Sequence, residues 1–341
     1  MDKNNFDGVR IGLALIVTLS HIGSLTQLPE FRFLEVVFNS NFAVKGFFAI
    51  SGFLVTKSYL SSKSLGNYIE KRARRIYPGY LCVILFCLLI GTITTHLPLT
   101  EFFLSGQTWR YLASNLVFLN FLQPGLPGAL EQNALPALNG SLWTIKIEVM
   151  LYACVPFMVY LARKSHPALM FLVLYLASVA WVYYFRYQYE GAQAAELARQ
   201  FPGQLAYFCT GALLATVPVL MQHLRWLALA TLIGLFAISS PYARLLLDPI
   251  AYAVIVIFLS TSACRDLNLG KFGDVSYGIY LYHFPIAQLL IAKGAFALAP
   301  WISLFATVAL TWAAAWLSWH YIEQPWLKRR LHTLEGTPST V

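Results

Sequence analysis

Hydrophobic residues along this chain gather into long unbroken runs instead of alternating with polar residues. Runs of about 18 or more apolar residues recur, and each is long enough to cross a bilayer as an α-helix. Continuous runs exclude the alternating pattern of a transmembrane β-barrel. The pattern therefore predicts an all-α polytopic membrane protein with about ten transmembrane helices. The expected spans are 10–28, 42–60, 76–96, 140–162, 167–186, 203–220, 225–240, 244–263, 273–293 and 299–320.

Between the third and fourth spans, segment 101–122 is amphipathic and rich in aromatic residues. Gly106 interrupts it, and Pro-Gly pairs at 124–125 and 127–128 follow it. These features predict an interfacial or re-entrant piece within one long loop, not an eleventh span. The whole of 1–330 is expected to form one membrane domain, followed by a short cytoplasmic tail at 331–341.

Composition agrees with this class of protein. Hydrophobic residues make up 58% of the 341 residues and charged residues only 11%, against about 25% in an average soluble domain. The net charge of +9 requires no nucleic-acid partner, because basic cytoplasmic loops explain it. The cysteines lack the spacing of a disulfide framework or metal site, and we interpret them as membrane-buried thiols. They are Cys82, Cys87, Cys154, Cys209 and Cys264.

Basic loop residues predict the orientation of the chain. With a cytoplasmic N-terminus, the inner loops receive the larger share of lysines and arginines, as the positive-inside rule requires. Both termini are therefore predicted to be cytoplasmic, and loop 97–139 to face outside. The inner set is Lys3, Arg10, Lys57, Lys63, Lys71, Arg72, Arg74, Arg75, Arg163, Lys164, Arg225, Arg265, Lys271, Lys328, Arg329 and Arg330. The outer set is Arg32, Arg110, Arg186, Arg199 and Arg244, with a few lysines at span edges.

The first span carries the clearest candidate chemistry, Arg10 at its entry and His21 deep inside. Eleven helical steps of ~100° leave a remainder of about 20°, so both side chains lie on one face, ~16 Å apart along the axis. Ionisable residues inside a membrane are candidates for function. The competing interpretation is a snorkelling arginine and a hydrogen-bonded packing histidine, and spacing alone does not choose between them.

Four polar residues are expected at a similar depth in the membrane. His21 and His283 enter from the cytoplasmic side, whereas Ser51 and Glu148 descend from the outer side. In a hydrocarbon core ~30 Å thick, these positions fall near one plane. The sequence therefore predicts a polar chamber near the middle of the bilayer.

A second basic feature precedes the third span. Arg72 and Arg75 are three residues apart and share a helix face. Together with Arg10 they are suited to binding phosphate, while ordinary positive-inside anchoring remains the alternative. Glu323 is interpreted as a partner for arginines, and Trp143 either as an interfacial anchor or as a platform for a sugar.

These residues occur in motifs that resemble the integral-membrane acyltransferase family three, which includes O-acetyltransferases of bacterial surface polysaccharides. The resemblance covers almost the whole chain. Its motifs are Asp7-Gly8-Val9-Arg10 with His21, the small-residue stretch Gly46–Leu54, Arg72–Pro78, Ser141-Leu142-Trp143-Thr144 with Glu148, Ser276-Tyr277 through His283-Phe284-Pro285, and Glu323-Gln324-Pro325. The small residues of Gly46–Leu54 are expected to serve close helix packing.

The chain departs from the family pattern at a few positions. Ile11 replaces a frequent glycine, Lys146-Ile147 replace a commoner small-polar and valine pair, and Gln324 replaces a frequent arginine. None of these changes removes a candidate catalytic group. Lys146 does alter the charge expected around Glu148.

The resemblance implies transfer of an acyl group, acetyl in the usual case, from acyl-coenzyme A to a hydroxyl of a cell-surface or lipid-linked glycan at the bacterial inner membrane. Acyl-coenzyme A is then a donor substrate, with no tightly bound cofactor and no metal. Arg10, Arg72 and Arg75 would bind its phosphates.

Within this scheme His21 would be the general base, because imidazole titrates near working pH. Glu148 would orient or charge-stabilise His21 or help to bind the acceptor, and Ser51, Trp143 and His283 would contact the substrate. Direct attack and an acyl-histidine intermediate both remain open. The alternative function is a transporter or flippase for a lipid-linked glycan or small organic anion, with the same arginines binding phosphate.

Overall fold

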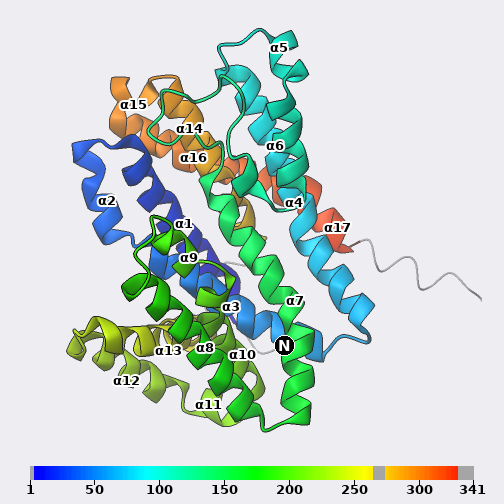
Figure 1. Cartoon of the computed structure of the whole chain (residues 1–341), viewed down its shortest axis with the longest axis vertical. Coiled ribbons are helices and arrows are strands. Elements are labelled where there is room, and N and C mark those ends of the chain that lie inside the picture. Colours follow the sequence, from blue (N-terminus) through cyan, green and yellow to red (C-terminus); the bar gives the residue numbers. More distant parts are fainter. Residues whose placement is uncertain (1–3, 264–272, 329–341) are drawn as a thin grey trace, which may run out of the picture. The chain divides into compact units, whose positions relative to one another are not determined.

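The computed structural model describes residues 4–263 and 273–328, and these residues form helices joined by turns and loops (Figure 1). Each predicted span corresponds to one helix. The long helices are α1 (Phe6–Thr26), α3 (Ser40–Leu60), α4 (Leu65–Thr94), α7 (Trp143–Lys164), α8 (Pro167–Tyr187), α10 (Phe201–Thr216), α12 (Leu224–Ala237), α13 (Pro241–Phe258), α14 (Ser276–Ala292) and α16 (Pro300–Ser318). Outside the described residues lie Lys3, Cys264, Arg265, Lys271, Arg329, Arg330 and the predicted tail 331–341.

Shorter helical pieces join these elements. They are η1 (Pro29–Phe31), α2 (Arg32–Val37), α5 (Leu99–Leu104), α6 (Gly106–Leu116), η2 (Asn120–Leu122), η3 (Gly140–Leu142), α9 (Ala194–Ala198), α11 (Pro218–Gln222), η4 (Leu259–Ala263), α15 (Ala295–Leu298), η7 (Trp319–Glu323) and α17 (Gln324–Lys328). Proline in the first turn marks the start of α8, α10, α13 and α16, where its missing N–H costs no helical hydrogen bond.

Seven helical stretches among the described residues are long and apolar enough to cross a membrane. They are Phe6–Thr26, Pro29–Leu60, Leu65–Thr94, Gly140–Lys164, Ala168–Tyr187, Pro241–Ala263 and Pro300–Leu327. This confirms an all-helical, multi-pass membrane protein. Helices α10, α12 and α14 have 16, 14 and 17 residues, or about 21–26 Å at ~1.5 Å per residue, which is less than the hydrocarbon core. The count of ten spans and the cytoplasmic termini stay predictions.

The start of α4 differs from the sequence-based expectation, whereas the 101–122 segment agrees with it. Helix α4 begins at Leu65, well before the apolar run, because the charged turn with the Glu70–Arg74 pair (2.6 Å) continues the same helix. The 101–122 segment forms α5 and α6, which break at Ser105, whose hydroxyl caps α6 by accepting the Gln107 N–H at 3.2 Å. Both helices are too short to cross a bilayer, as predicted.

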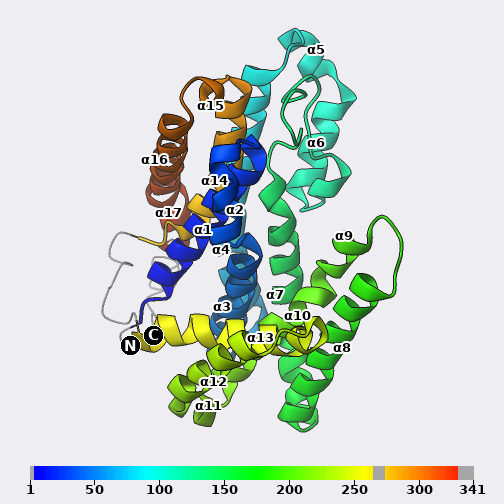
Figure 2. The same cartoon turned by 90° about the vertical axis from the view of Figure 1, so that its left-hand side faces the viewer.

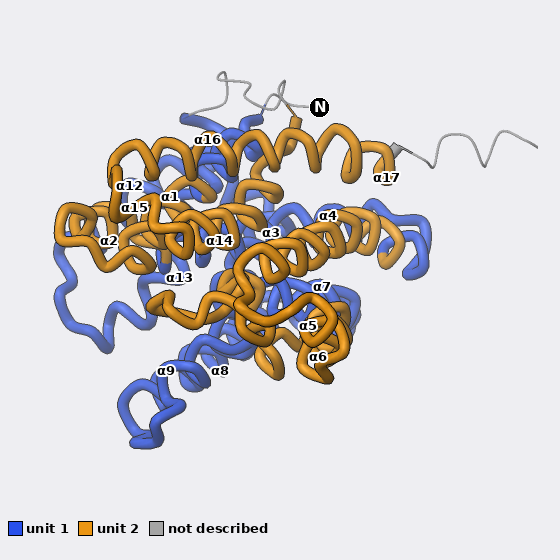
Figure 3. The backbone as a smooth tube through the Cα atoms, turned by 90° about the horizontal axis from the view of Figure 1, so that it is seen from above, with its two compact units in different colours: residues 1–13, 41–68, 144–271 blue, residues 14–40, 69–143, 272–341 orange. Residues whose placement is uncertain are grey.

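The chain divides into two compact units, which are described separately (Figure 3). Among the described residues, unit 1 comprises 4–13, 41–68 and 144–263, and unit 2 comprises 14–40, 69–143 and 273–328. In unit 1, α8, α10 and α13 pack against one another, and α12 packs along α13 (Figure 2). In unit 2, α14 packs along α16, and the short η3 turn contacts α14.

Glycines bring two backbones of unit 1 into contact. A Cβ at Gly52 of α3 would lie 2.0 Å from the Phe208 carbonyl oxygen, and a Cβ at Gly211 of α10 would lie 2.0 Å from the Ala49 carbonyl oxygen. Only glycine fits at either position, so α3 and α10 touch backbone to backbone. The expectation that the small residues of Gly46–Leu54 serve helix packing is therefore confirmed.

Helix α14 is attached to the loop before α7 by buried amides. Pro285 has no N–H for the Leu281 carbonyl, and Asn139 Nδ2 donates to that carbonyl at 2.8 Å instead. One turn further on, Gln288 Nε2 donates to the Ala137 carbonyl at 2.7 Å. These bonds satisfy polar groups that would otherwise be buried without partners, and they fix the loop 133–139 against α14.

Candidate functional site

Two of the predicted site residues, His21 of α1 and His283 of α14, form a direct pair in unit 2. His21 Nδ1 lies 2.9 Å from His283 Nε2. The ring centroids are 5.1 Å apart and the ring planes are inclined by 21°, so the two rings meet edge to edge in nearly one plane. His283 is 1% exposed, whereas His21 remains partly exposed. The His283 side chain is therefore enclosed by the fold. His21 uses Nδ1 for the contact with His283 and is still partly exposed.

The surroundings of the pair hold both rings in place. His283 Nδ1 lies 3.1 Å from the Ile279 carbonyl oxygen, one turn earlier in α14. The Phe284 ring meets His21 edge-on, with centroids 5.5 Å apart. The hydroxyl of Ser141, in the η3 turn, lies 3.3 Å from His283 Nε2. These contacts of His283 come from α1, α14 and η3.

Asn139 places the η3 turn beside this pair. Its side-chain oxygen accepts the Ser141 N–H at 3.1 Å, while its amide nitrogen serves the Leu281 carbonyl. A Cβ at Gly140 would lie 2.7 Å from the Phe284 ring, so glycine allows the turn to approach α14. Ser141 and Phe284 belong to the motifs noted in the sequence, but Asn139 and Gly140 were not predicted to lie at the site. Pro285 could have indicated such a contact, because proline has no N–H for the Leu281 carbonyl and a donor from outside the helix has to replace it.

The other two residues predicted for the polar chamber, Ser51 and Glu148, meet in unit 1. Ser51 Oγ donates to Glu148 Oε1 at 3.0 Å, and the Tyr152 hydroxyl donates to the same oxygen. Sequence reasoning missed Tyr152, although its spacing of four residues from Glu148 on α7 places both on one helix face. Two hydroxyl donors suit a charged carboxylate. A single chamber holding the histidines and this cluster stays a prediction.

Lys146, which raised a question about the charge around Glu148, contacts a different residue. Its Nζ donates to Gln200 Oε1 at 3.0 Å, just before α10 begins. Trp143 begins α7 and is partly buried. Its predicted role as an interfacial anchor or sugar platform remains a prediction.

Arg75 is engaged by two carboxylates of unit 2. Its guanidinium pairs with Asp274 and, at 3.5 Å, with Glu323. Its side chain is 15% exposed and that of Glu323 is 1% exposed. The Tyr277 and Trp319 rings lie with centroids 5.5 and 5.8 Å from the guanidinium carbon. The interpretation of Glu323 as an arginine partner is confirmed.

This geometry changes the role expected for Arg75. Two carboxylates already pair with this guanidinium, so a phosphate would compete with them for Arg75. Arg72 and Arg10 are partly buried on α4 and α1. These two arginines remain the better candidates for contacting a phosphorylated ligand.

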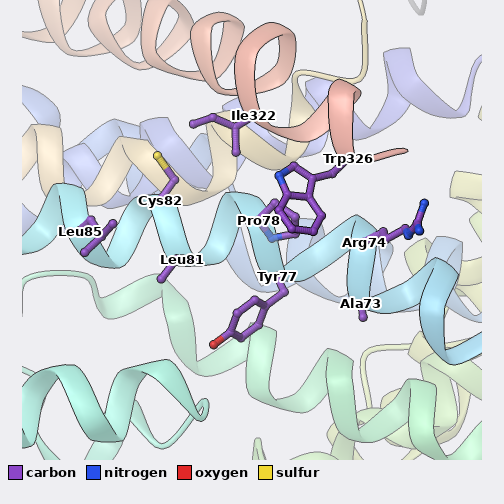
Figure 4. Close-up of a pocket in the computed structure, with 9 residues that line it drawn as sticks. All are labelled: Ala73, Arg74, Tyr77, Pro78, Leu81, Cys82, Leu85, Ile322 and Trp326. Carbon is purple, nitrogen blue, oxygen red and sulfur yellow. The ribbon is translucent and has the colours of Figure 1, made fainter. Parts of the chain in front are cut away.

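A hydrophobic groove of about 420 Å³ lies between α4 and the C-terminal helices of unit 2 (Figure 4). None of the predicted site residues lines it. Its walls are Ala73, Arg74, Tyr77, Pro78, Leu81, Cys82, Leu85, Ile322 and Trp326. Cys82, like Cys87, Cys154 and Cys209, is a free thiol. Within 4–263 and 273–328, no group of three or more His, Cys, Asp or Glu side chains is placed to hold a metal ion.

Comparison with known proteins adds a family assignment to this geometry. A family model described as an acyltransferase domain matches residues 3–320. An O-acetyl transferase of Shigella phage Sf6 is 28% identical over 342 residues, covering 96% of this chain and 98% of that protein. Nodulation protein 10 of Rhizobium leguminosarum bv. viciae is 29% identical over 360 residues, covering 96% of this chain and 94% of that protein. No solved structure matches the chain.

Proposed function

Because this chain belongs to the acyltransferase family whose domain spans residues 3–320, we propose that it moves an acetyl group from acetyl-coenzyme A to a hydroxyl of a cell-surface or lipid-linked glycan in the bacterial inner membrane. The enzyme class, acyltransferase, follows from the family and decides against the transporter alternative. The name of the phage relative supports acetyl as the transferred group.

The observation that carries this proposal is the contact of the partly exposed His21 with the buried His283. In the proposed reaction the acceptor hydroxyl oxygen attacks the thioester carbonyl carbon while His21 takes the hydroxyl proton. The carbon–sulfur bond then breaks, and the leaving sulfur takes the proton back from the imidazolium. An imidazole is suited to both steps because it gains and loses a proton near neutral pH.

The remaining predicted residues divide between the two substrates. We assign the donor phosphates to Arg10 and Arg72, because guanidinium groups bind phosphate with charge-assisted hydrogen bonds. Arg75, three residues after Arg72 on α4, supports them by fixing this part of the helix through Asp274 and Glu323. Glu148, held by Ser51 and Tyr152, supplies negative charge for the reaction or for the acceptor hydroxyls, and Trp143 offers a face for the sugar.

The donor assignment predicts that purified protein in lipid nanodiscs binds acetyl-coenzyme A and that Arg72→Ala weakens this binding about tenfold or more. The expected loss corresponds to ~1.5–3 kcal/mol for a hydrogen bond to a charged group. Isothermal titration of wild type and variant provides the measurement. Lys63→Ala is the matched control, since Lys63 is an exposed cation in the turn just before α4. No detectable binding by the wild type would contradict the proposed donor, whereas equal affinity of wild type and Arg72→Ala would contradict only the role of Arg72.

For the orientation, we propose ten crossings with both termini in the cytoplasm, so that the donor binds on the inner side. A cysteine introduced at Ser62 is then expected to react with an impermeant maleimide only after spheroplasts are permeabilised. A cysteine at Gln132, in the long loop, is expected to react without permeabilisation. The experiment uses a background without native cysteines and quantifies labelling by gel shift. The opposite labelling pattern would reverse the donor and acceptor sides.

A further inference from the structure

The hydrogen bonds of His283 determine which of its nitrogens carries a proton. Its Nδ1 lies 3.1 Å from the Ile279 carbonyl oxygen. A carbonyl oxygen only accepts hydrogen bonds, so Nδ1 must be the N–H nitrogen. His283 is 1% exposed and has no acidic partner among the described residues, so the uncharged ring is the form that this environment favours. A neutral ring with its proton on Nδ1 has a lone pair on Nε2.

The proton position of His21 follows from that of His283. His21 Nδ1 lies 2.9 Å from the Nε2 lone pair of His283. Two lone pairs do not form a hydrogen bond, so His21 Nδ1 must carry the N–H and donate it. The neutral ring of His21 then has its lone pair on Nε2. The Ser141 hydroxyl, at 3.3 Å, adds a second and longer donor to His283 Nε2, which fits the same assignment.

We propose that His283 is a positioning residue that holds His21 in the Nδ1–H form, so that the Nε2 lone pair of His21 is the base for the acceptor hydroxyl. This inference rests on the proposed function. His283 takes the place that a carboxylate occupies in a Ser-His-Asp triad, fixing the tautomer and orientation of the neighbouring imidazole. It differs in being uncharged and in donating its own Nδ1–H to the backbone carbonyl of Ile279.

The arrangement also explains how His21 can take a proton in a largely apolar environment. When His21 Nε2 is protonated, the positive charge spreads over the ring, and the existing bond from Nδ1 to His283 becomes charge-assisted. No carboxylate has to be buried beside the ring for this stabilisation. The role assigned here replaces the substrate contact that the motif around His283 suggested.

Two variants of similar size separate this role from packing. The side-chain oxygen of glutamine reaches about the position of histidine Nε2, so His283→Gln retains the acceptor and is expected to keep kcat within about tenfold of wild type. His283→Leu fills the space without an acceptor and is expected to lose 100-fold or more in kcat, as wrong-tautomer variants of catalytic histidines do. The KM for acetyl-coenzyme A and the melting temperature are expected to stay near wild type in both variants. Equal loss in both variants would overturn the proposal.

A spectroscopic measurement tests the tautomer without relying on activity. In protein labelled with ¹⁵N-histidine, His21 is expected to show a protonated Nδ1 and an unprotonated Nε2, assigned by the signals lost in His21→Gln. In His283→Leu the His21 signals are expected to shift towards the Nε2–H form, while the exposed His223→Gln control leaves them unchanged. An Nε2–H form of His21 in the wild type would overturn the inference. The expected tautomer in a protein that transfers no acetyl group would instead contradict the proposed function alone.

Discussion

Replacing His21 with alanine is expected to reduce acetyl transfer by about 10²–10⁴-fold, the usual contribution of a general base. The donor contacts assigned to Arg10 and Arg72 do not involve the imidazole, so binding of acetyl-coenzyme A is expected to stay near wild type. The side chain of His21 is partly exposed. Within the described residues, the hydrogen bond found for its imidazole is the one to His283. Its removal is therefore expected to change the melting temperature in detergent only slightly.

The outcome distinguishes a base from a packing residue. A packing histidine would lose stability and activity together, whereas a base loses the rate alone. The measurement is release of the coenzyme A thiol in vitro, combined with mass spectrometry of the surface glycan from a deletion strain that carries each variant. His223→Ala serves as the control for removing an exposed imidazole. Transfer by His21→Ala at a rate close to wild type would remove the basis of the mechanism.

Replacing Arg75 with alanine is expected to have the largest effect on stability, a loss of about 3–5 kcal/mol in the free energy of unfolding. The change removes the guanidinium that pairs with Asp274 and with the Glu323 carboxylate, which is 1% exposed. Chemical or thermal unfolding in detergent, followed by intrinsic fluorescence, measures the loss. Arg74→Ala is the matched control, because its pair with Glu70 is a more exposed one along the same helix and is worth about 0.3–0.5 kcal/mol.

A second change tests the physical cause. Adding Glu323→Gln to Arg75→Ala replaces the buried carboxylate with a neutral amide and is expected to recover part of the lost stability. The expected coupling energy between the two sites is about 0.5–3 kcal/mol. The phosphate role suggested by the spacing of Arg72 and Arg75 predicts a different result. Unchanged stability with weakened acetyl-coenzyme A binding in Arg75→Ala would return Arg75 to the donor site.

Much of the helical framework is predictable from the sequence because a bilayer requires long apolar runs. Each expected span corresponds to a helix, and the break at Gly106 corresponds to the break between α5 and α6. The difficult elements were α10, α12 and α14, where glycines, prolines and polar residues shorten the helix while the apolar run continues. The early start of α4 was missed because a charged helical turn carries no hydrophobic signal.

Site contacts were predictable only in part, because helical spacing gives depth and facing direction but not the identity of neighbouring helices. The equal depth of His21 and His283 was visible in the sequence, whereas their contact depends on α1 packing beside α14, 262 residues away along the chain. The partners of Arg75 are 199 and 248 residues away, so its spacing from Arg72 suggested phosphate binding and could not show these two contacts. Tyr152 was local and could have been found from its spacing to Glu148.

The backbone contact between α3 and α10 has a consequence for Ser51, which precedes Gly52 directly. Each helix contributes one glycine and one facing carbonyl, so a shift of α3 by a single residue would place Ser51 or Phe53, instead of Gly52, against the Phe208 carbonyl. The register of α3 is thereby fixed, and with it the position of the Ser51 hydroxyl that donates to Glu148. This polar cluster is therefore preorganised, and a ligand that bound there would not have to supply the free energy of ordering it.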